Sequence, residues 1–461
     1  MPLLIRNGEI VTANARYRAD IYCDAEAITR IGPALSAPAD CEVIDAAGKL
    51  IFPGFIDPHV HIYLPFMGTL AKDTYPTASR AALVGGTTTL IEMVCPARGD
   101  DPWEAYSLWK SQAAGRSACD YAFHFGVTRF DDSTPAVLRQ IVDDGTSSFK
   151  VFLAYKGAFG IDDGELYRTL ELARQLGVVV TAHCENAELV FQRQRQLLAE
   201  GKTGPQWHEP SRPPCVEAEG VHHLATFAEL TGASVYVVHT SCADALDAGR
   251  NARSRGVDIA VEVVIPHLVL DRSYAERPDF EGAKYVMSPP LRDKQHQEAL
   301  WQALAAGDVA TVATDHAPFD FHGQKEMGRD DFTKIPNGIP SIEDRVHLLY
   351  THGVATGRID LHRFVDVAST AAARRFGLYP KKGAIELGAD ADLVVFDPSY
   401  HGVISARTQQ MNVDYSAFEG WPITGRADTV TVRGRVQVRG GRFVGAGDHG
   451  RMQQRAATPP A

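Results

Sequence analysis

The hydrophobic pattern of the chain changes twice along its length. Residues 1–52 hold short apolar runs separated by turns, and no helical period appears among them. From residue 53 to residue 376, short apolar runs alternate with amphipathic stretches of helical period. Short strand-like runs return after residue 376, for example at 392–396 and 429–432. The pattern predicts a small β unit at each end of the chain and a long β/α region between them.

The middle region contains eight apolar runs that are typical of buried parallel strands, with amphipathic helical stretches such as Leu166–Leu176 between them. Eight such units predict a (β/α)8 barrel of the TIM type, an α/β fold. Two long polar segments, Arg193–Pro214 and Gly323–Pro336, are expected to be loops. The predicted strands are Phe52–His61, Thr87–Val94, Tyr121–Val127, Ser148–Leu153, Val178–His183, Ser234–His239, Ile259–Glu262 and Val309–Asp315.

The terminal strands resemble each other in pattern, so we expect them to pair into one small β-sandwich domain. That domain would comprise residues 1–52 together with 377–445, and the barrel, residues 53–376, would be inserted between its two halves. Asn7-Gly8 is a strong hairpin signal and predicts that the first two strands form a hairpin. Residues 446–461 form a C-terminal tail, in which Arg451–Ala461 is expected to be loose or to contact a partner in an oligomer.

Composition narrows the class of protein. With 45% hydrophobic and 22% charged residues among 461, the chain is expected to be globular, and no apolar run reaches the length of a membrane span. The start of the sequence lacks the features of a signal peptide, and seven scattered cysteines favour reduced thiols in a cytoplasm. A formal net charge of −11 argues against nucleic acid or an anionic membrane as a partner.

The candidate chemistry begins with His59 and His61 at the end of the first predicted strand. Residues two apart on a strand project to the same side, so both imidazoles can reach one ion. Taken alone, a histidine at a strand end is more often a hydrogen-bonded core group. Here four further metal-ligand or amine side chains lie on later strands, and barrel enzymes place their chemistry at the strands' carboxyl ends. The set of His59, His61, Lys150, His183, His239 and Asp315 predicts a metal centre.

Four imidazoles and a carboxylate exceed the ligands of one open catalytic zinc, so the count suggests two ions. Two ions a few ångströms apart need an anionic bridge. Lys150 can supply one if its neutral amine has reacted with carbon dioxide, because the carbamate has the charge and the two oxygens of a carboxylate. The alternative is a lysine that extends to the barrel mouth or pairs with an acid. The residues alone leave both possibilities open.

Five segments contain the predicted ligands: Phe55-Ile56-Asp57-Pro58-His59-Val60-His61, Ser148-Phe149-Lys150, Thr181-Ala182-His183-Cys184-Glu185-Asn186, Val237-Val238-His239 and Thr314-Asp315-His316-Ala317-Pro318. In order and spacing they resemble the cyclic amidohydrolases, most closely the dihydropyrimidinase and D-hydantoinase branch, and the likeness extends over essentially the whole chain. The resemblance implies two Zn2+ per chain. His59, His61 and Asp315 would hold one, His183 and His239 the other, and a CO2-derived carbamate on Lys150 would bridge them.

The same resemblance implies hydrolytic ring opening of a cyclic amide, by a hydroxide that two zinc ions activate, to give an N-carbamoyl amino acid. Asp315 would be the proton shuttle and Tyr155 would stabilise the oxyanion. Backbone groups of Ser288 and Asn337 would hold the cyclic amide. It also implies a homo-oligomer, a homotetramer or a dimer.

The residues after His61 bear on the substrate. Relatives that act on dihydroorotate place an arginine there, whereas this chain has the apolar run Ile62–Met67. Burying a carboxylate beside it without a partner would be costly. Phe152 and Phe159 add apolar surface. We therefore expect small neutral rings, dihydropyrimidines and 5-substituted hydantoins, as substrates, with allantoin as the alternative.

Two alternatives lie outside this class of enzyme. One is a non-catalytic scaffold related to dihydropyrimidinase, which would lack metal ligands. The other is a single-metal deaminase, which would leave Lys150 unexplained. Further residues near the predicted site are His124, expected in the core, His267 and His316, possible partners of the ligands, and Glu92 and Cys95, which end the second strand.

Overall fold

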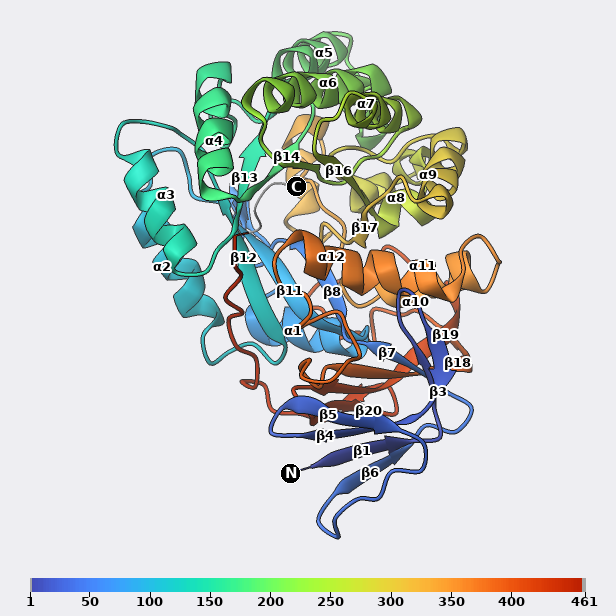
Figure 1. The fold of residues 1–461 in the computed structure, drawn as a ribbon. Coiled ribbons are helices and arrows are strands. Elements are labelled where there is room, and N and C mark those ends of the chain that lie inside the picture. Colours follow the sequence, from blue (N-terminus) through green and yellow to red (C-terminus); the bar gives the residue numbers. More distant parts are fainter. Residues whose placement is uncertain (1, 458–461) are drawn as a thin grey trace.

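The structure is a computed structural model that describes residues 2–457. Its centre is a sheet of eight parallel strands arranged in chain order, surrounded by helices (Figure 1). This arrangement confirms the predicted barrel. The strands are β8 (Phe55–Val60), β11 (Thr87–Val94), β12 (Asp120–Gly126), β13 (Ser148–Phe152), β14 (Val179–His183), β15 (Val235–Val237), β16 (Ile259–Val264) and β17 (Thr311–Ala313).

The first and last strands of this sheet meet at their carboxyl ends. The backbone N–H of Asp315 donates to the carbonyl of His59 over 3.0 Å, and that of His61 donates to the carbonyl of His316 over 2.8 Å. Val60 and His316 form the corresponding parallel bridge. The segment after β17 therefore joins β8 and brings the first and last predicted metal ligands of the chain side by side.

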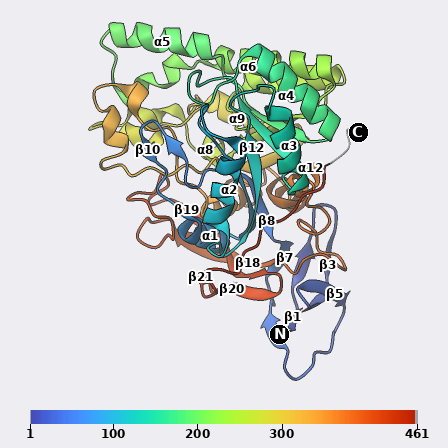
Figure 2. The same ribbon diagram turned by 90° about the vertical axis from the view of Figure 1, so that its left-hand side faces the viewer.

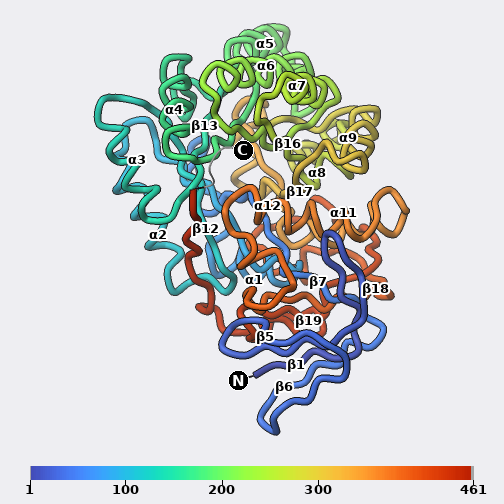
Figure 3. Tube along the Cα trace, in the orientation of Figure 1, coloured from blue at the N-terminus to red at the C-terminus, as the bar shows by residue number. Residues whose placement is uncertain are grey.

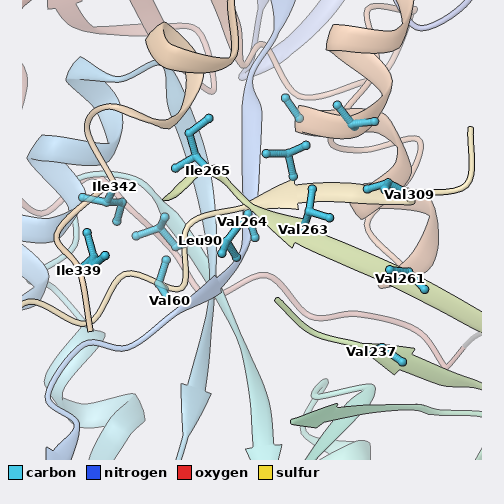
Figure 4. Packing of buried hydrophobic residues seen from close by; sticks show 14 of the residues in the cluster. Val60, Leu90, Val237, Val261, Val263, Val264, Ile265, Val309, Ile339 and Ile342 are labelled. Atoms are coloured by element: carbon cyan, nitrogen blue, oxygen red, sulfur yellow. The ribbon is translucent and has the colours of Figure 1, made fainter. Parts of the chain in front are cut away.

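Helices cover the outside of the sheet, so its strands are buried on both faces. Every residue of β11 and β12 is buried, which explains why the barrel strands appear in the sequence as continuous apolar runs. Figure 4 shows Val237, Val261 and Val263 packed on neighbouring strands. The helices are α1 (Tyr75–Val84), α2 (Pro102–Ala113), α3 (Thr134–Asp143), α4 (Asp163–Leu176), α5 (Ala187–Ala199), α6 (Pro214–Thr231), α7 (Ala243–Ser254), α8 (Ile265–Val269), α9 (Lys294–Ala306), α10 (Arg345–Leu349), α11 (Leu361–Val365) and α12 (Ala371–Arg375).

A smaller unit of two sheets lies at the opposite end of the molecule from α5 and α6 (Figure 2). Both ends of the chain contribute to it, because Leu393–Phe396 pairs antiparallel with Leu50–Pro53. Ile5, Ile21, Ile51 and Val395 pack in its core, which confirms the predicted sandwich. Its strands are β1 (Leu3–Arg6), β2 (Glu9–Val11), β3 (Arg16–Arg18), β4 (Asp20–Asp24), β5 (Ala27–Gly32), β6 (Glu42–Asp45), β7 (Leu50–Pro53), β18 (Leu393–Val403), β19 (Pro422–Val432), β20 (Arg435–Arg439) and β21 (Arg442–Phe443).

Two predictions for the small unit and its junction are wrong in detail. The run 52–61 is not one strand, because β7 ends at Pro53 in the small unit and β8 begins at Phe55 in the barrel. Asn7-Gly8 does not form a hairpin, because β1 pairs with β4 and β6 whereas β2 pairs with β3 and β7. The chain changes sheets at this turn, where Asn7 has a φ of 64°.

Two segments expected to be irregular or loose are ordered. Residues 193–199 of the segment Arg193–Pro214 belong to α5, and two short 3-10 turns, Pro205–Trp207 and Glu209–Ser211, follow in it. The C-terminal segment as far as residue 457 runs along β12 (Figure 3), where Gln453 N–H donates to the carbonyl of Tyr121 over 2.7 Å. Arg455 is buried and donates to Ser148 Oγ over 2.9 Å. This segment is therefore part of the barrel's packing; the expected tail residues 458–461 lie outside the described chain.

Within residues 2–457, no helix combines the length and the apolar character needed to cross a membrane.

Candidate metal centre

All of the predicted site residues line one cleft. Some of them lie on β8, β13 and β14, and the others lie in loops that follow strands. Residues far apart in the sequence therefore line the same cleft. Lys150 differs from the expected position at a strand end, because it lies in the middle of β13. The lining residues are His59, His61, Leu64, Phe66, Lys150, Phe152, Tyr155, Phe159, His183, His239, Ser288, Asp315, Ala317 and Asn337.

The first candidate ligand group is formed by His59, His61 and Asp315. Nε2 of His59 lies 3.0 Å from Asp315 Oδ1, and Nε2 of His61 lies 3.1 Å from the same oxygen. One ligand atom from each residue lies within 4.8 Å of the others, and all three side chains are buried. Burial lowers the pKa of His59, but Asp315 and Glu262 outweigh it and raise that pKa to about 9. The surroundings therefore favour a cation at this point.

The second candidate group is formed by His183 and His239. Nδ1 of His183 lies 3.0 Å from Nε2 of His239, and the ring centroids are 4.7 Å apart. Two ring nitrogens this close either share a proton or converge on one cation. Burial lowers the pKa of both imidazoles below 6.5, so both favour the neutral form, which is the form that binds metal ions.

Lys150 lines the same cleft as the two histidine groups and is fully buried. Within residues 2–457 its Nζ has no hydrogen-bond partner, although it lies 4.9 Å from the centre of the Phe152 ring. Burial lowers the pKa of Lys150 to about 8, against the opposing effect of Asp315. A neutral amine is therefore accessible near neutral pH, and it is the form that reacts with carbon dioxide.

The residues present fit a metal centre. Among the described residues, Nζ of Lys150 and Nδ1 of His239 are buried without a hydrogen-bond partner, although burying an unpaired polar atom is costly. Imidazole nitrogens and carboxylate oxygens are the usual ligands of zinc. Binding of divalent cations in the cleft would explain both the unpartnered buried atoms and the presence of these ligand types together.

Two carboxylates outside the predicted set orient the histidines. Glu262 Oε1 lies 2.7 Å from His59 Nδ1 and accepts the backbone N–H of His239 over 2.9 Å. Glu185 Oε2 lies 2.7 Å from His183 Nε2, and Arg212 donates to the same oxygen over 2.5 Å. Such partners fix which ring nitrogen faces a metal. Glu262 ends the seventh predicted strand. A carboxylate at a strand end of the barrel was the feature of the sequence that could have identified it as a site residue.

Asp57 holds together the two segments that carry His59 and Asp315. Its Oδ2 accepts the hydroxyl of Thr314 over 2.6 Å, while its Oδ1 accepts the backbone N–H groups of Thr314 and His59 over 3.2 and 3.3 Å. Next to this clamp, Asp315 has a φ of 52°. A left-handed conformation is uncommon for a residue other than glycine, and residues held in it recur at functional sites.

Tyr155, Ser288 and Asn337 lie close together in the lining of the same cleft. Asn337 Nδ2 donates to Ser288 Oγ over 2.9 Å and lies 3.5 Å from the Tyr155 hydroxyl. Burial raises the pKa of Tyr155 above 10, so its hydroxyl keeps its proton near neutral pH. His208, which the sequence did not single out, lies 3.1 Å from Ser288 Oγ through Nε2.

The remaining residues near the site stabilise loops. His316 Nε2 lies 2.7 Å from Asp73 Oδ2, and His267 Nε2 lies 3.0 Å from the carbonyl of Pro289, so neither imidazole contacts a predicted ligand. His124 is buried in the core, 2.6 Å from Ser148 Oγ. Glu92 accepts the backbone N–H of Ile62 over 2.9 Å and so holds the start of the apolar loop.

Comparison with known proteins identifies the family. The model of the amidohydrolase family matches residues 50–437. The D-hydantoinase of Geobacillus stearothermophilus is 47% identical over 99% of this chain and 97% of its own length. The dihydropyrimidinase of Dictyostelium discoideum is 38% identical over 94% of this chain and 87% of its own length.

Solved structures agree with this assignment. The D-hydantoinase (dihydropyrimidinase) from Thermus sp. is 63% identical, with a TM-score of 0.98 over 99% of this chain and all of that one. The L-hydantoinase (dihydropyrimidinase) from Arthrobacter aurescens is 29% identical, with a TM-score of 0.88 over 98% of this chain and 99% of that one. The chain is therefore an enzyme of the amidohydrolase family, in the branch of the D-hydantoinases and dihydropyrimidinases.

Proposed function

We propose that the protein opens the rings of cyclic amides, 5,6-dihydropyrimidines and 5-substituted hydantoins, by hydrolysis to N-carbamoyl amino acids. The observation that carries the proposal is one cleft lined by four histidines, a buried lysine and an aspartate, with three ring-holding candidates beside them. A scaffold protein has no need of this set. A single-metal deaminase would leave Lys150 without a role.

Two zinc ions are part of the proposal. His59, His61 and Asp315 would hold one, His183 and His239 the other, and a carbamate on Lys150 would bridge them. When bound, such ions lower the pKa of water and polarise a carbonyl oxygen.

Asp315 is proposed to move the proton. Burial raises its pKa, but the imidazoles of His59 and His61 outweigh burial and hold that pKa well below 3.8. The carboxylate is therefore ionised and can accept a proton from the attacking water. It can then deliver that proton to the ring nitrogen as the C–N bond breaks, acting first as general base and then as general acid.

Tyr155, Ser288 and Asn337 are proposed to bind the ring. The Tyr155 hydroxyl, which keeps its proton, can donate to the oxygen on which negative charge develops. The backbone N–H groups of Ser288 and Asn337 donate to no acceptor in residues 2–457, so both are free to bind a substrate. Such donors are positioned before the reaction begins.

The walls of the cleft support a neutral ring with an apolar substituent. Phe66 and Phe159 stack with their centroids 6.1 Å apart, and Phe66 meets Tyr155 edge to face. Phe66, Tyr155 and Phe159 also line a neighbouring apolar pocket formed by the loop 63–70 and by Leu108 and Trp109. A substituent on the ring can extend into this pocket. The lining of this pocket also contains Lys156. This lysine is half exposed and its charge is paired with Glu188 over 3.3 Å.

The test is to measure turnover of dihydrouracil, hydantoin, a 5-aryl hydantoin, allantoin and dihydroorotate side by side. The proposal predicts the highest kcat/KM for the first three. Allantoin as the best substrate would favour the alternative ring, and dihydroorotate as the best substrate would overturn the argument from the apolar loop.

A reducing compartment, the cytoplasm, and assembly into a homotetramer or dimer are also part of the proposal. All seven cysteines are unpaired, which supports the first. Measurement of the molar mass in solution tests the second.

A further inference from the structure

Lys325 is a buried cation that the chemistry described so far does not use. It is fully buried at the start of a 3-10 turn, Lys325–Gly328, in the long loop after β17. Its Nζ donates to three backbone carbonyls, those of Pro336 over 2.7 Å, Gly338 over 2.8 Å and Val286 over 2.9 Å. It forms no ion pair with the residues that the structure describes, and no charged neighbour perturbs it.

The geometry requires the charged form of this side chain. Burial alone lowers the pKa of Lys325 well below 10.5 and so favours the neutral amine. A neutral amine has two N–H groups, however, whereas three carbonyl oxygens lie within hydrogen-bond distance. With a neutral amine, the nitrogen lone pair would face one of these oxygens. Three charge-assisted hydrogen bonds offset the cost of burial and keep the ammonium.

The three carbonyls belong to the two loops that carry the proposed ring-binding groups. Val286 lies two residues before Ser288, and Pro336 and Gly338 flank Asn337. The two loops also contact each other directly, because Gly338 N–H donates to the carbonyl of Val286 over 2.9 Å. The ammonium therefore holds the Ser288 segment against the Asn337 segment, and Lys325 itself is not among the residues that line the cleft.

One of these hydrogen bonds also acts on a proposed substrate donor, the backbone N–H of Asn337. The carbonyl of Pro336 and the N–H of Asn337 are the two ends of a single peptide unit. Resonance couples them, so a cation at the oxygen withdraws electron density from the nitrogen and makes its N–H a stronger donor. That N–H has no acceptor within residues 2–457, and Asn337 lines the cleft.

We propose that Lys325 is a positioning residue for substrate recognition, one that holds the Ser288 and Asn337 loops together and strengthens the Asn337 N–H as a donor to the ring. The proposal rests on the proposed function, because it assumes that these groups bind a cyclic amide. Lys325 does not touch the substrate and takes no part in the chemical step.

The test compares three variants of the full-length, metal-loaded enzyme with the wild type. Lys325→Met keeps an unbranched side chain only one atom shorter and removes all donors, and Lys325→Gln keeps two donors without the charge. Lys334→Met is the control, since Lys334 is an exposed lysine of the same loop that pairs with Asp331 over 3.4 Å. For each protein, kcat and KM for hydantoin, metal per chain and Tm are measured.

We expect Lys325→Met to raise KM about tenfold with a smaller change in kcat, the effect of losing one well-aligned hydrogen bond to the bound ring. Lys325→Gln should give an intermediate KM, metal content should stay at the wild-type level, and Lys334→Met should match the wild type. An unchanged KM in both Lys325 variants would overturn the proposal. Loss of metal together with activity, or failure of both variants to fold, would assign Lys325 a purely structural role and would also overturn it. If the wild type does not open the ring, the proposed function itself is rejected. That result is obtained before any variant is compared, so it is distinguishable from failure of the proposal for Lys325.

Discussion

His59 Nδ1 lies 2.7 Å from Glu262 Oε1, and both side chains are fully buried. If the imidazole donates to this carboxylate, its lone pair lies on Nε2, the atom that faces Asp315. Glu262 also accepts the hydroxyl of Tyr236 over 2.7 Å and the backbone N–H of His239. One glutamate thus orients a histidine from each of the two candidate ligand groups.

Glu262→Gln should therefore weaken metal binding without removing a ligand. Loss of such a partner typically costs about 10- to 100-fold in metal affinity. Competition with a chelator, followed by measurement of zinc per chain, tests this. Glu92→Gln is the matched control, a buried barrel carboxyl that touches no predicted ligand and whose pKa burial raises well above 4.5. Equal zinc retention by Glu262→Gln and Glu92→Gln would argue against the orienting role.

Asp315→Asn should retain the fold and lose turnover. An amide cannot accept and return the proton, and general acid–base catalysis contributes about 10²- to 10⁴-fold to a rate. The measurements are kcat for hydantoin and Tm. Activity close to that of the wild type would exclude Asp315 as the proton shuttle.

Lys150 should carry one added CO2 group per chain in the metal-loaded protein. Its pKa of about 8 means that its neutral amine is much more abundant at neutral pH than that of an ordinary lysine. In protein stripped of metal, the fraction of Lys150 that carries the carbamate should therefore increase as the pH rises through about 8, and it should be smaller at lower pH. Native mass spectrometry with added bicarbonate measures this, with Lys150→Arg as the control. A metal-loaded protein without the added group would show that the bridge is something else.

Asp344 should make the protein less stable as the pH rises. Burial raises its pKa to about 7, although Gln409 donates to its two oxygens over 2.7 and 2.8 Å. The folded state therefore keeps a proton that the unfolded chain releases from about pH 4 upward, so stability falls between there and about pH 7. Asp344→Asn should remove the contribution of this carboxyl to the slope, a difference on the order of a few kcal/mol. Urea unfolding at about pH 5 and about pH 8 measures it. The exposed Asp330→Asn is the control, and a slope equal to the wild type's in Asp344→Asn would contradict the assignment.

Sequence patterns predicted the parts of this molecule that depend on local periodicity or on chain order. The barrel strands were recognisable because both of their faces are buried, and the candidate ligands because strands of a barrel share one carboxyl end. Contacts between distant residues were not recognisable. Glu262 is 203 residues from the histidine that it orients. Arg212 donates to Glu185 from an irregular segment, and no hydrophobic periodicity predicts that contact.

The same limit explains the two errors in the small unit and the tail. The Asn7-Gly8 turn has the composition of a hairpin, but the pairing of β2 with β7 is fixed by core packing of Ile10 and Ile51, which lie in register. Arg451–Ala461 has little apolar content, yet Arg455 is buried because backbone and hydroxyl acceptors of the barrel surround it. A segment whose polar residues are buried by long-range hydrogen bonds has the same composition as a loose tail, so the sequence alone does not distinguish the two.

Turnover of hydantoin and dihydrouracil by the purified enzyme, followed while zinc per chain is measured, tests zinc-dependent ring opening most directly. We expect an N-carbamoyl amino acid as product, loss of turnover when a chelator removes the zinc, and recovery when about two zinc ions per chain are restored. Release of ammonia instead of ring opening, or full turnover by protein free of metal, would contradict it.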